Sequence, residues 1–183
     1  MDVSLRPLAR ADLTLYPAWL TAVDAEHYMS RFYPRCWNGG DPIQVPDTAW
    51  YAILAGGEAA GSVWVEAEEG EPGAARLGIL IRRPDLLGRG IGRRTIALAI
   101  AQARPRLGFG CVRLNVRQDN ARTIACYRAC GLTVVGQHVK QGEAGPVPYL
   151  VMELICRPDA TSPWILDDSV ASGIPSAGGR CAS

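Results

Sequence analysis

An apolar strand, a glycine-rich turn and a helix follow one another near the middle of this 183-residue chain. Residues 79–81 form the strand pattern, and the turn contains Gly88, Gly90 and Gly92. Glycine lets the backbone approach a ligand without interference from a Cβ atom, and the first N–H groups of a helix have no partner inside the helix. The pattern predicts an anion-binding site at the helix start, and a diphosphate suits it best.

The glycine spacing disfavours two common classes of phosphate site. A dinucleotide-binding loop needs G-x-G-x-x-G, but the sixth position counted from Gly88 is Arg93, and counted from Gly90 it is Thr95. A nucleoside-triphosphate loop ends in Gly-Lys-Ser/Thr, whereas Gly92 is followed by arginine, which argues against a phosphate-transfer enzyme. On the glycines alone, a tight turn without a ligand remains open.

The arginines of the chain are concentrated around this turn. Residues 72–130 contain twelve arginines and two acidic residues, a formal charge of +10, so the rest of the chain carries −9 within a total of +1. A positive region of this kind raises the local concentration of a polyanionic small ligand. Nucleic acid is the rival polyanion, but almost no aromatic residues are interleaved with these arginines, and we expect no nucleic-acid partner.

Length and composition are those of one domain with a tail. The 48% hydrophobic content is ample for a single core. No apolar run approaches the roughly 20 residues of a membrane span, and the N-terminus lacks the basic and apolar blocks of a signal peptide. We therefore expect a cytoplasmic protein without a membrane partner.

The cysteines and histidines predict no metal site. The six cysteines are scattered without a C-x-x-C pair, and the histidines do not cluster. Cys126 and Cys130 lie four apart on a predicted helix and are interpreted as small buried hydrophobic residues. His27 and His138 have no partner at motif spacing and are assigned no role.

The order of the predicted elements indicates an α/β domain with a mixed, mostly antiparallel central sheet flanked by helices. Asn120 is a natural cap for the last helix, Gly131 ends it, and Pro105 is expected to end the helix before it. Residues 1–156 form the predicted domain, and 157–183, rich in proline, glycine and serine, form a predicted flexible tail. The expected strands are 4–8, 50–54, 61–68, 75–81, 112–116, 133–139 and 148–155, and the expected helices are 11–31, 92–103 and 121–130.

The strand at 61–68 has a polar face in this interpretation. Ser62, Trp64, Glu66 and Glu68 alternate with apolar residues and share one side. The acidic hairpin tip, from Glu66 to Glu71, is predicted to be solvated. The strand is expected to pair as an antiparallel hairpin with residues 75–81.

Two blocks of the sequence resemble the GNAT superfamily of N-acetyltransferases, over about residues 5–155. The first, residues 87–92, is similar to the family's acetyl-coenzyme A loop, R/Q-x-x-G-x-G/A. The second, residues 112–132, is similar to the strand and helix that follow in the family. The two blocks occur in the family's order and about thirty residues apart, which makes the resemblance specific.

The resemblance implies an enzyme that transfers the acetyl group of acetyl-coenzyme A to a primary amine of a small molecule or peptide, without a metal. Tyr127 is implied as the general acid. A homodimer and a non-catalytic acyl-coenzyme A sensor or scaffold are left open. The implied cofactor-binding residues are Leu80, Ile81, Arg82, Gly88, Arg89, Gly90, Ile91, Gly92, Arg93 and Asn120.

Three positions depart from the family pattern. Leu87 stands where the loop has arginine or glutamine, so main-chain donors must suffice for the diphosphate. Asn115 stands where members that acetylate ribosomal-protein N-termini have a glutamate base, and Arg76 stands where many relatives have an acid. Glu66 and Glu68 are the remaining candidates for a base, and the alternative is an amine that loses its proton to bulk solvent. The acidic residues outside the arginine-rich region suggest a cationic acceptor.

Overall fold

The computed structural model describes residues 1–22, 29, 31–142 and 145–156. The predicted tail, His27 and part of the predicted helix at 11–31 lie outside this range. The strands are β1 (Val3–Pro7), β2 (Thr48–Ala55), β3 (Glu58–Ala67), β4 (Ala74–Ile81), β5 (Cys111–Arg117), β6 (Thr133–Gly142) and β7 (Gly145–Ile155). The helices are α1 (Arg10–Leu13), α2 (Tyr16–Ala22), α4 (Ile91–Leu107) and α5 (Ala121–Ala129), with 3-10 turns η1 (Pro42–Gln44) and η2 (Pro84–Leu86).

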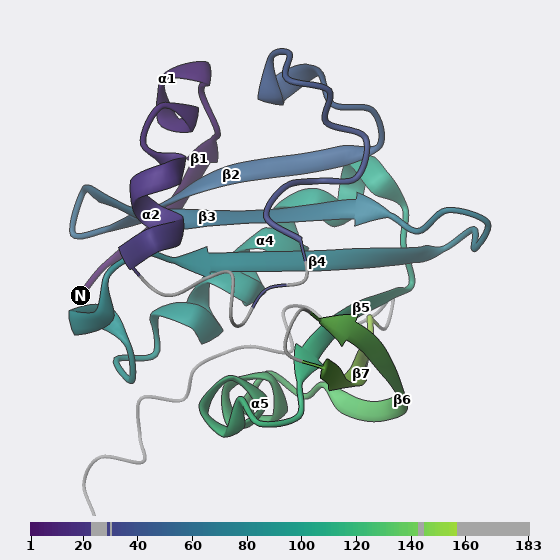
Figure 1. Cartoon of the computed structure of the whole chain (residues 1–183). Coiled ribbons are helices and arrows are strands. Elements are labelled where there is room, and N and C mark those ends of the chain that lie inside the picture. The colour runs from purple at the N-terminus through teal and green to yellow at the C-terminus, as the bar shows by residue number, and fades with distance from the viewer. Residues whose placement is uncertain (23–28, 30, 143–144, 157–183) are drawn as a thin grey trace, which may run out of the picture.

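The seven strands form one sheet in the order β1-β2-β3-β4-β5-β7-β6. Every neighbouring pair is antiparallel except β4 and β5, which are parallel. Helix α2 lies in front of the sheet and α4 behind it (Figure 1). The predicted mixed, mostly antiparallel sheet with flanking helices is therefore confirmed, including the β3–β4 hairpin.

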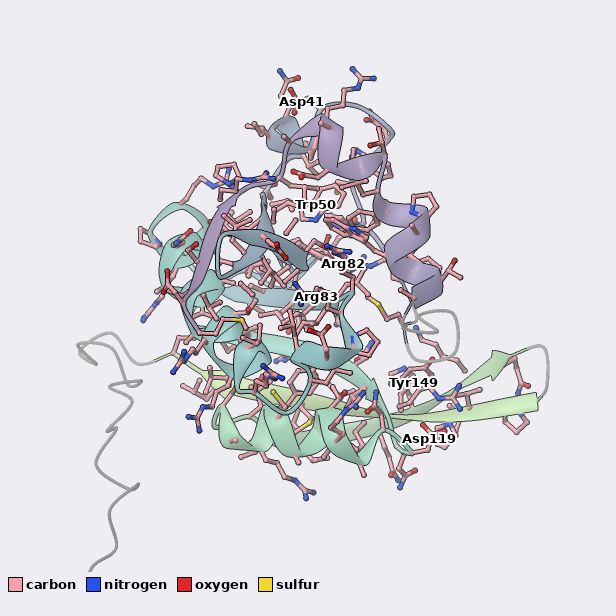
Figure 2. The ribbon with its side chains drawn as sticks, turned by 90° about the vertical axis from the view of Figure 1, so that its left-hand side faces the viewer. Asp41, Trp50, Arg82, Arg83, Asp119 and Tyr149 are labelled. Carbon is pink, nitrogen blue, oxygen red and sulfur yellow. The ribbon has the colours of Figure 1, made fainter. Side chains whose placement is uncertain are left out.

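The two faces of the sheet have different cores. The face under α4 and α5 is mainly aliphatic and contains Leu114, Ile96 and Met152. The opposite face, under α1 and α2, is aromatic: Trp50 packs edge-on against Trp64 and against Tyr16. In Figure 2, Trp50 lies between the strands and these two short helices.

The polar face predicted for β3 is in fact buried beneath the aromatic core. Ser62, Trp64 and Glu66 are each at most 5% exposed. The Ser62 hydroxyl is hydrogen-bonded to the Tyr16 hydroxyl, and the Glu66 carboxylate accepts hydrogen bonds from Arg31 and from the Arg35 main chain. The prediction of a solvated Glu66 was wrong because an alternating strand does not reveal that a distant segment covers its polar side.

Pro105 lies inside α4 instead of ending it. A proline removes the hydrogen bond to the carbonyl four residues earlier, which here belongs to the exposed Ala101. Water can satisfy that carbonyl, so the helix continues to Gly108, whose left-handed backbone (φ 68°) provides the cap. The helix thereby gains one more turn, which packs Leu107 against the aliphatic core.

Gly78 of β4 allows the Trp64 indole to lie closer to the main chain than a residue with a Cβ atom would permit. A Cβ atom built at this position would lie 2.1 Å from Cζ2 of the buried Trp64. We expect Gly78→Ala to lower the free energy of unfolding by about 2–3 kcal/mol, because the indole must shift within a packed cluster. Thermal unfolding measures this as a fall in Tm of about 5–10 °C. Gly110→Ala is the control, because its nearest neighbour lies at 3.9 Å; equal Tm values for the two variants would contradict the prediction.

Candidate active site

The sheet opens between its two parallel strands. β4 and β5 are paired only at their beginnings, through residues 74–76 and 111–113. Beyond these pairs the strands separate, so in the described part of the chain the rest of β4, from Leu77 to Ile81, has no strand on its β5 side. Main-chain groups along this edge are left available to a bound molecule.

A cavity of about 870 Å³ occupies this opening. It brings together the end of β4, the glycine-rich turn and the first residues of α4 and α5. Eight of the ten cofactor-binding residues named from the sequence line it, together with Tyr127. They are Leu80, Ile81, Gly88, Gly90, Ile91, Gly92, Arg93 and Asn120.

The glycine-rich turn has the geometry of an anion-binding helix start. Gly88 and Gly90 both have left-handed backbones, with φ of 78° and 74°, a conformation that favours glycine. Gly90 is the N-cap of α4 and its carbonyl accepts from the Arg94 N–H at 3.1 Å. The three N–H groups between these residues precede the first intrahelical hydrogen bond, so they point out of the helix at the cavity.

Asn120 has the structural role that the sequence predicted. It is the N-cap of α5, and its side-chain oxygen accepts from the Thr123 N–H at 3.2 Å. Because Asn120 also lines the cavity, the start of α5 faces the start of α4 across the opening.

Tyr127 lies on α5 with its ring in the aliphatic core and is 7% exposed. Burial raises the pKa of its hydroxyl, so the group stays protonated throughout the neutral range. Within the described part of the chain no side chain or main-chain group is hydrogen-bonded to this hydroxyl, and the residue lines the cavity. It is therefore placed to donate a proton to a molecule in the opening.

Cys126 differs from the small buried hydrophobic residue that the sequence predicted. Cys130 is buried as expected, but Cys126 is half-buried and lines the cavity. The side-chain hydrogen bond with Cys130, with a smaller contribution from Arg93, lowers the pKa of Cys126 below its ordinary value. The sulfur lies 3.3 Å from where a Cβ atom of Gly92 would be, so a side chain at Gly92 would crowd it.

The other two implied cofactor residues, Arg82 and Arg89, do not line the cavity. Arg82 donates from Nε to the Ala59 carbonyl at 2.9 Å and lies over the Trp19 ring, on the aromatic face of the sheet (Figure 2). Its main-chain N–H donates to the Ala60 carbonyl at 2.9 Å. Arg89 is an exposed residue of the turn.

The positive charge of residues 72–130 is partly neutralised by acids from outside this stretch. Glu58 pairs with Arg83, Glu68 with Arg76, and both Glu71 and Glu153 with Arg113. Composition alone therefore overstated the polarity of the molecule, because folding brings these acids to the arginines. Arg93 and Arg122 line the cavity near the helix starts and form no ion pair within the described residues.

Neither candidate for a general base reaches the cavity. Glu66 and Glu68 line a separate pocket of about 210 Å³, beside Arg35 and Cys36. Among the described residues, no aspartate or glutamate lines the larger cavity, and no cluster of ligands that could hold a metal is found. No helix in the described ranges is long and apolar enough to cross a membrane.

Sequence reasoning did not bring together one wall of the cavity, although it singled out Arg76 and Asn115, which belong to it. This wall consists of side chains from the aromatic face of the sheet and its surroundings. No local pattern joins them, because they come from five separate segments of the chain. They are Met29, Arg31, Trp64, Arg76, Asn115 and Lys140.

Comparison with known proteins supports the same family as the two sequence blocks. The family model described as Acetyltransferase (GNAT) family matches residues 12–132. The mycothiol acetyltransferase of Salinispora tropica is 28% identical over 132 residues, which is 67% of this chain and 42% of that protein. The chain thus spans less than half the length of this curated relative.

Solved structures with the same fold include two acetyltransferases bound to coenzyme A. A spermidine N-acetyltransferase from Vibrio cholerae, in complex with coenzyme A and spermine, is 19% identical over 84% of this chain and 95% of its own, with a TM-score of 0.69. An aminoglycoside acetyltransferase in complex with coenzyme A and kanamycin is 20% identical over 82% and 94%, with a TM-score of 0.61. At these identities the likeness establishes the fold.

Proposed function

This chain belongs to the GNAT family of acetyltransferases, and we propose that it transfers the acetyl group of acetyl-coenzyme A to a primary amine of a small molecule or peptide. The observation that carries the proposal is the position of the glycine-rich helix start and Tyr127 in one cavity, at the point where β4 and β5 separate. The proposed catalytic unit is residues 1–156.

The proposed cofactor site follows the cavity from the turn to the strands. The N–H groups at the start of α4, between Gly90 and Arg94, bind the diphosphate, and Arg93 adds positive charge beside it. The edge of β4 around Leu80 and Ile81 lies along the pantetheine and thioester, and Asn120 contacts the cofactor from α5. Because Leu87 supplies no polar contact, the main-chain donors provide most of the diphosphate binding. Arg82 and Arg89 lie outside the cavity lining.

In the proposed reaction a neutral amine attacks the thioester carbonyl carbon directly. A C–N bond forms, and main-chain N–H groups at the open edge of β4 stabilise the oxyanion of the tetrahedral intermediate. The C–S bond then breaks, and Tyr127 gives its proton to the leaving thiolate. The ammonium proton formed on attack leaves to solvent. Tyr127 regains a proton from solvent before the next turnover.

A non-catalytic acyl-coenzyme A sensor is the second candidate, and one observation favours it: no carboxylate of the described residues lines the cavity. Two measurements separate the alternatives. Calorimetry measures acetyl-coenzyme A binding, and a thiol-release assay measures transfer against a panel of amines and peptides. Thiol release that depends on the amine supports the enzyme, whereas binding without release supports the sensor. If the protein neither binds acetyl-coenzyme A nor releases thiol, both the enzyme and the sensor function are contradicted.

A further inference from the structure

The cavity passes through the sheet, so its two ends have different chemistry. Successive residues of a strand point to opposite faces. In β4, Leu77 belongs to the aliphatic core and Leu80 to the aromatic core, and Asn115 of β5 alternates with residues of the aliphatic core. The glycine-rich turn and Tyr127 thus line the aliphatic face. The wall formed by Met29, Arg31, Trp64, Arg76, Asn115 and Lys140, here called the acceptor wall, lines the aromatic face.

The acceptor wall presents cations to the cavity and keeps their carboxylate partners behind them. Arg31 is hydrogen-bonded to Glu66, and Arg76 donates to Glu68 at 2.7 Å. Both glutamates line the smaller pocket and are absent from the lining of the larger one. These contacts fix each arginine in place. The remaining N–H donors of each guanidinium are available to a molecule in the cavity.

Lys140 adds a charge that no carboxylate of the described residues neutralises. Its ammonium lies 5.4 Å from the centre of the Tyr149 ring. Tyr149 lies on the β6–β7 hairpin (Figure 2). It is also the single lysine of the 183-residue sequence. The ring contact holds the exposed side chain at the cavity without removing its charge.

Two neutral residues of the wall, Trp64 and Asn115, also carry N–H donors. Trp64 is 2% exposed and its indole N–H has no hydrogen-bond partner among the described residues, although the ring lines the cavity. A buried donor without a partner is costly unless a bound molecule or water satisfies it. Asn115 supplies the only side-chain oxygen of the wall. A molecule that complements this wall must bring oxygen acceptors and negative charge.

We infer that the acceptor is an amine that carries an anionic oxygen group, a carboxylate or a phosphate, rather than a polyamine. This inference rests on the proposed acetyl transfer and specifies its second substrate. The anionic group binds Arg31, Arg76 and Lys140, and the amine then faces the thioester across the opening. It also replaces the expectation of a cationic acceptor drawn from the acidic residues outside 72–130, since Glu66 and Glu68 line the smaller pocket and are absent from the lining of the larger one.

The test compares matched amines that differ in one charge. Amino acids are compared with their amides, and phosphoethanolamine with ethanolamine, while spermidine represents the cationic class. We expect kcat/KM to be about tenfold or more higher for the anionic member of at least one pair, which also distinguishes carboxylate from phosphate. A higher kcat/KM for the amides or for spermidine would overturn the inference while leaving acetyl transfer intact.

Substitution of the single lysine makes the test specific. Lys140→Gln is expected to lower the preference for the anionic amine about fivefold to tenfold, mainly through KM, whereas Lys140→Arg retains it. Arg128→Gln, an exposed arginine of α5 outside the cavity lining, is the matched control. An unchanged preference in Lys140→Gln would contradict a role for this charge.

If no amine is acetylated, the proposed enzyme function fails and the wall is tested by binding. Calorimetry with the coenzyme A complex then compares the same pairs of amines in the wild type and in Lys140→Gln. Binding of the anionic member that weakens in the variant supports the anionic site. Equal binding of both members, or no binding of the anionic one, overturns it.

Discussion

The Tyr127→Phe variant is expected to retain acetyl-coenzyme A binding and to lose about 100-fold or more in kcat. Removal of the hydroxyl leaves the ring in the core but takes away the proposed donor to the thiolate, and a positioned acid typically contributes 10²–10⁴-fold. Stopped-flow or steady-state measurement of thiol release gives kcat. Calorimetry gives the dissociation constant for acetyl-coenzyme A, which we expect to change by less than about twofold. Unchanged turnover would remove Tyr127 from the mechanism.

The pH dependence of the wild type provides a second check on Tyr127. Burial raises the pKa of the hydroxyl above its ordinary value of about 10, so the protonated, active form persists to higher pH than for a free tyrosine. The rate should therefore not fall between about pH 8 and pH 10 through ionisation of this residue. A loss of kcat in that range that is absent from Tyr127→Phe would contradict the raised pKa of this hydroxyl.

Gly90→Asp is expected to weaken coenzyme A binding by about 100-fold without unfolding the protein. Gly90 has a left-handed backbone, which aspartate and asparagine tolerate better than other residues, and no atom of the protein lies within 4 Å of a Cβ atom there. The new carboxylate would lie beside the free N–H groups of α4 and repel the diphosphate. Calorimetry with coenzyme A measures the change, and thermal unfolding verifies the fold.

Gly90→Asn separates charge from shape in this experiment. The asparagine side chain matches aspartate in size but carries no charge, so we expect it to weaken binding by about tenfold or less. Equal affinities for the two variants would mean that the charge at the helix start is unimportant. Wild-type affinity in both would show that the diphosphate does not bind at this turn.

The parts of the structure that sequence reasoning predicted depend on local chemistry. The glycine-rich helix start, the Asn120 cap and the end of α5 at Gly131 each follow from backbone requirements of neighbouring residues. The alternation of polar and apolar residues, together with the turn residues, likewise predicted the β3–β4 hairpin. These features need no knowledge of what packs against them.

The features that were missed depend on contacts between distant segments. The polar side of β3 could not be recognised as buried, because the covering residues, such as Tyr16 and Arg35, belong to other parts of the chain. The acceptor wall combines Arg31 and Lys140, which come together only when the sheet forms. Pro105 was misjudged because its effect depends on whether the carbonyl it displaces faces water.

The opening between β4 and β5 has a consequence for the order of events in the proposed reaction. Because the passage is lined from both faces of the sheet, a molecule lodged at the glycine-rich end does not obstruct arrival at the end lined by Arg31 and Lys140. Both reactants can be bound at the same time, and the acetyl group is then transferred directly between them without an acetyl-enzyme intermediate.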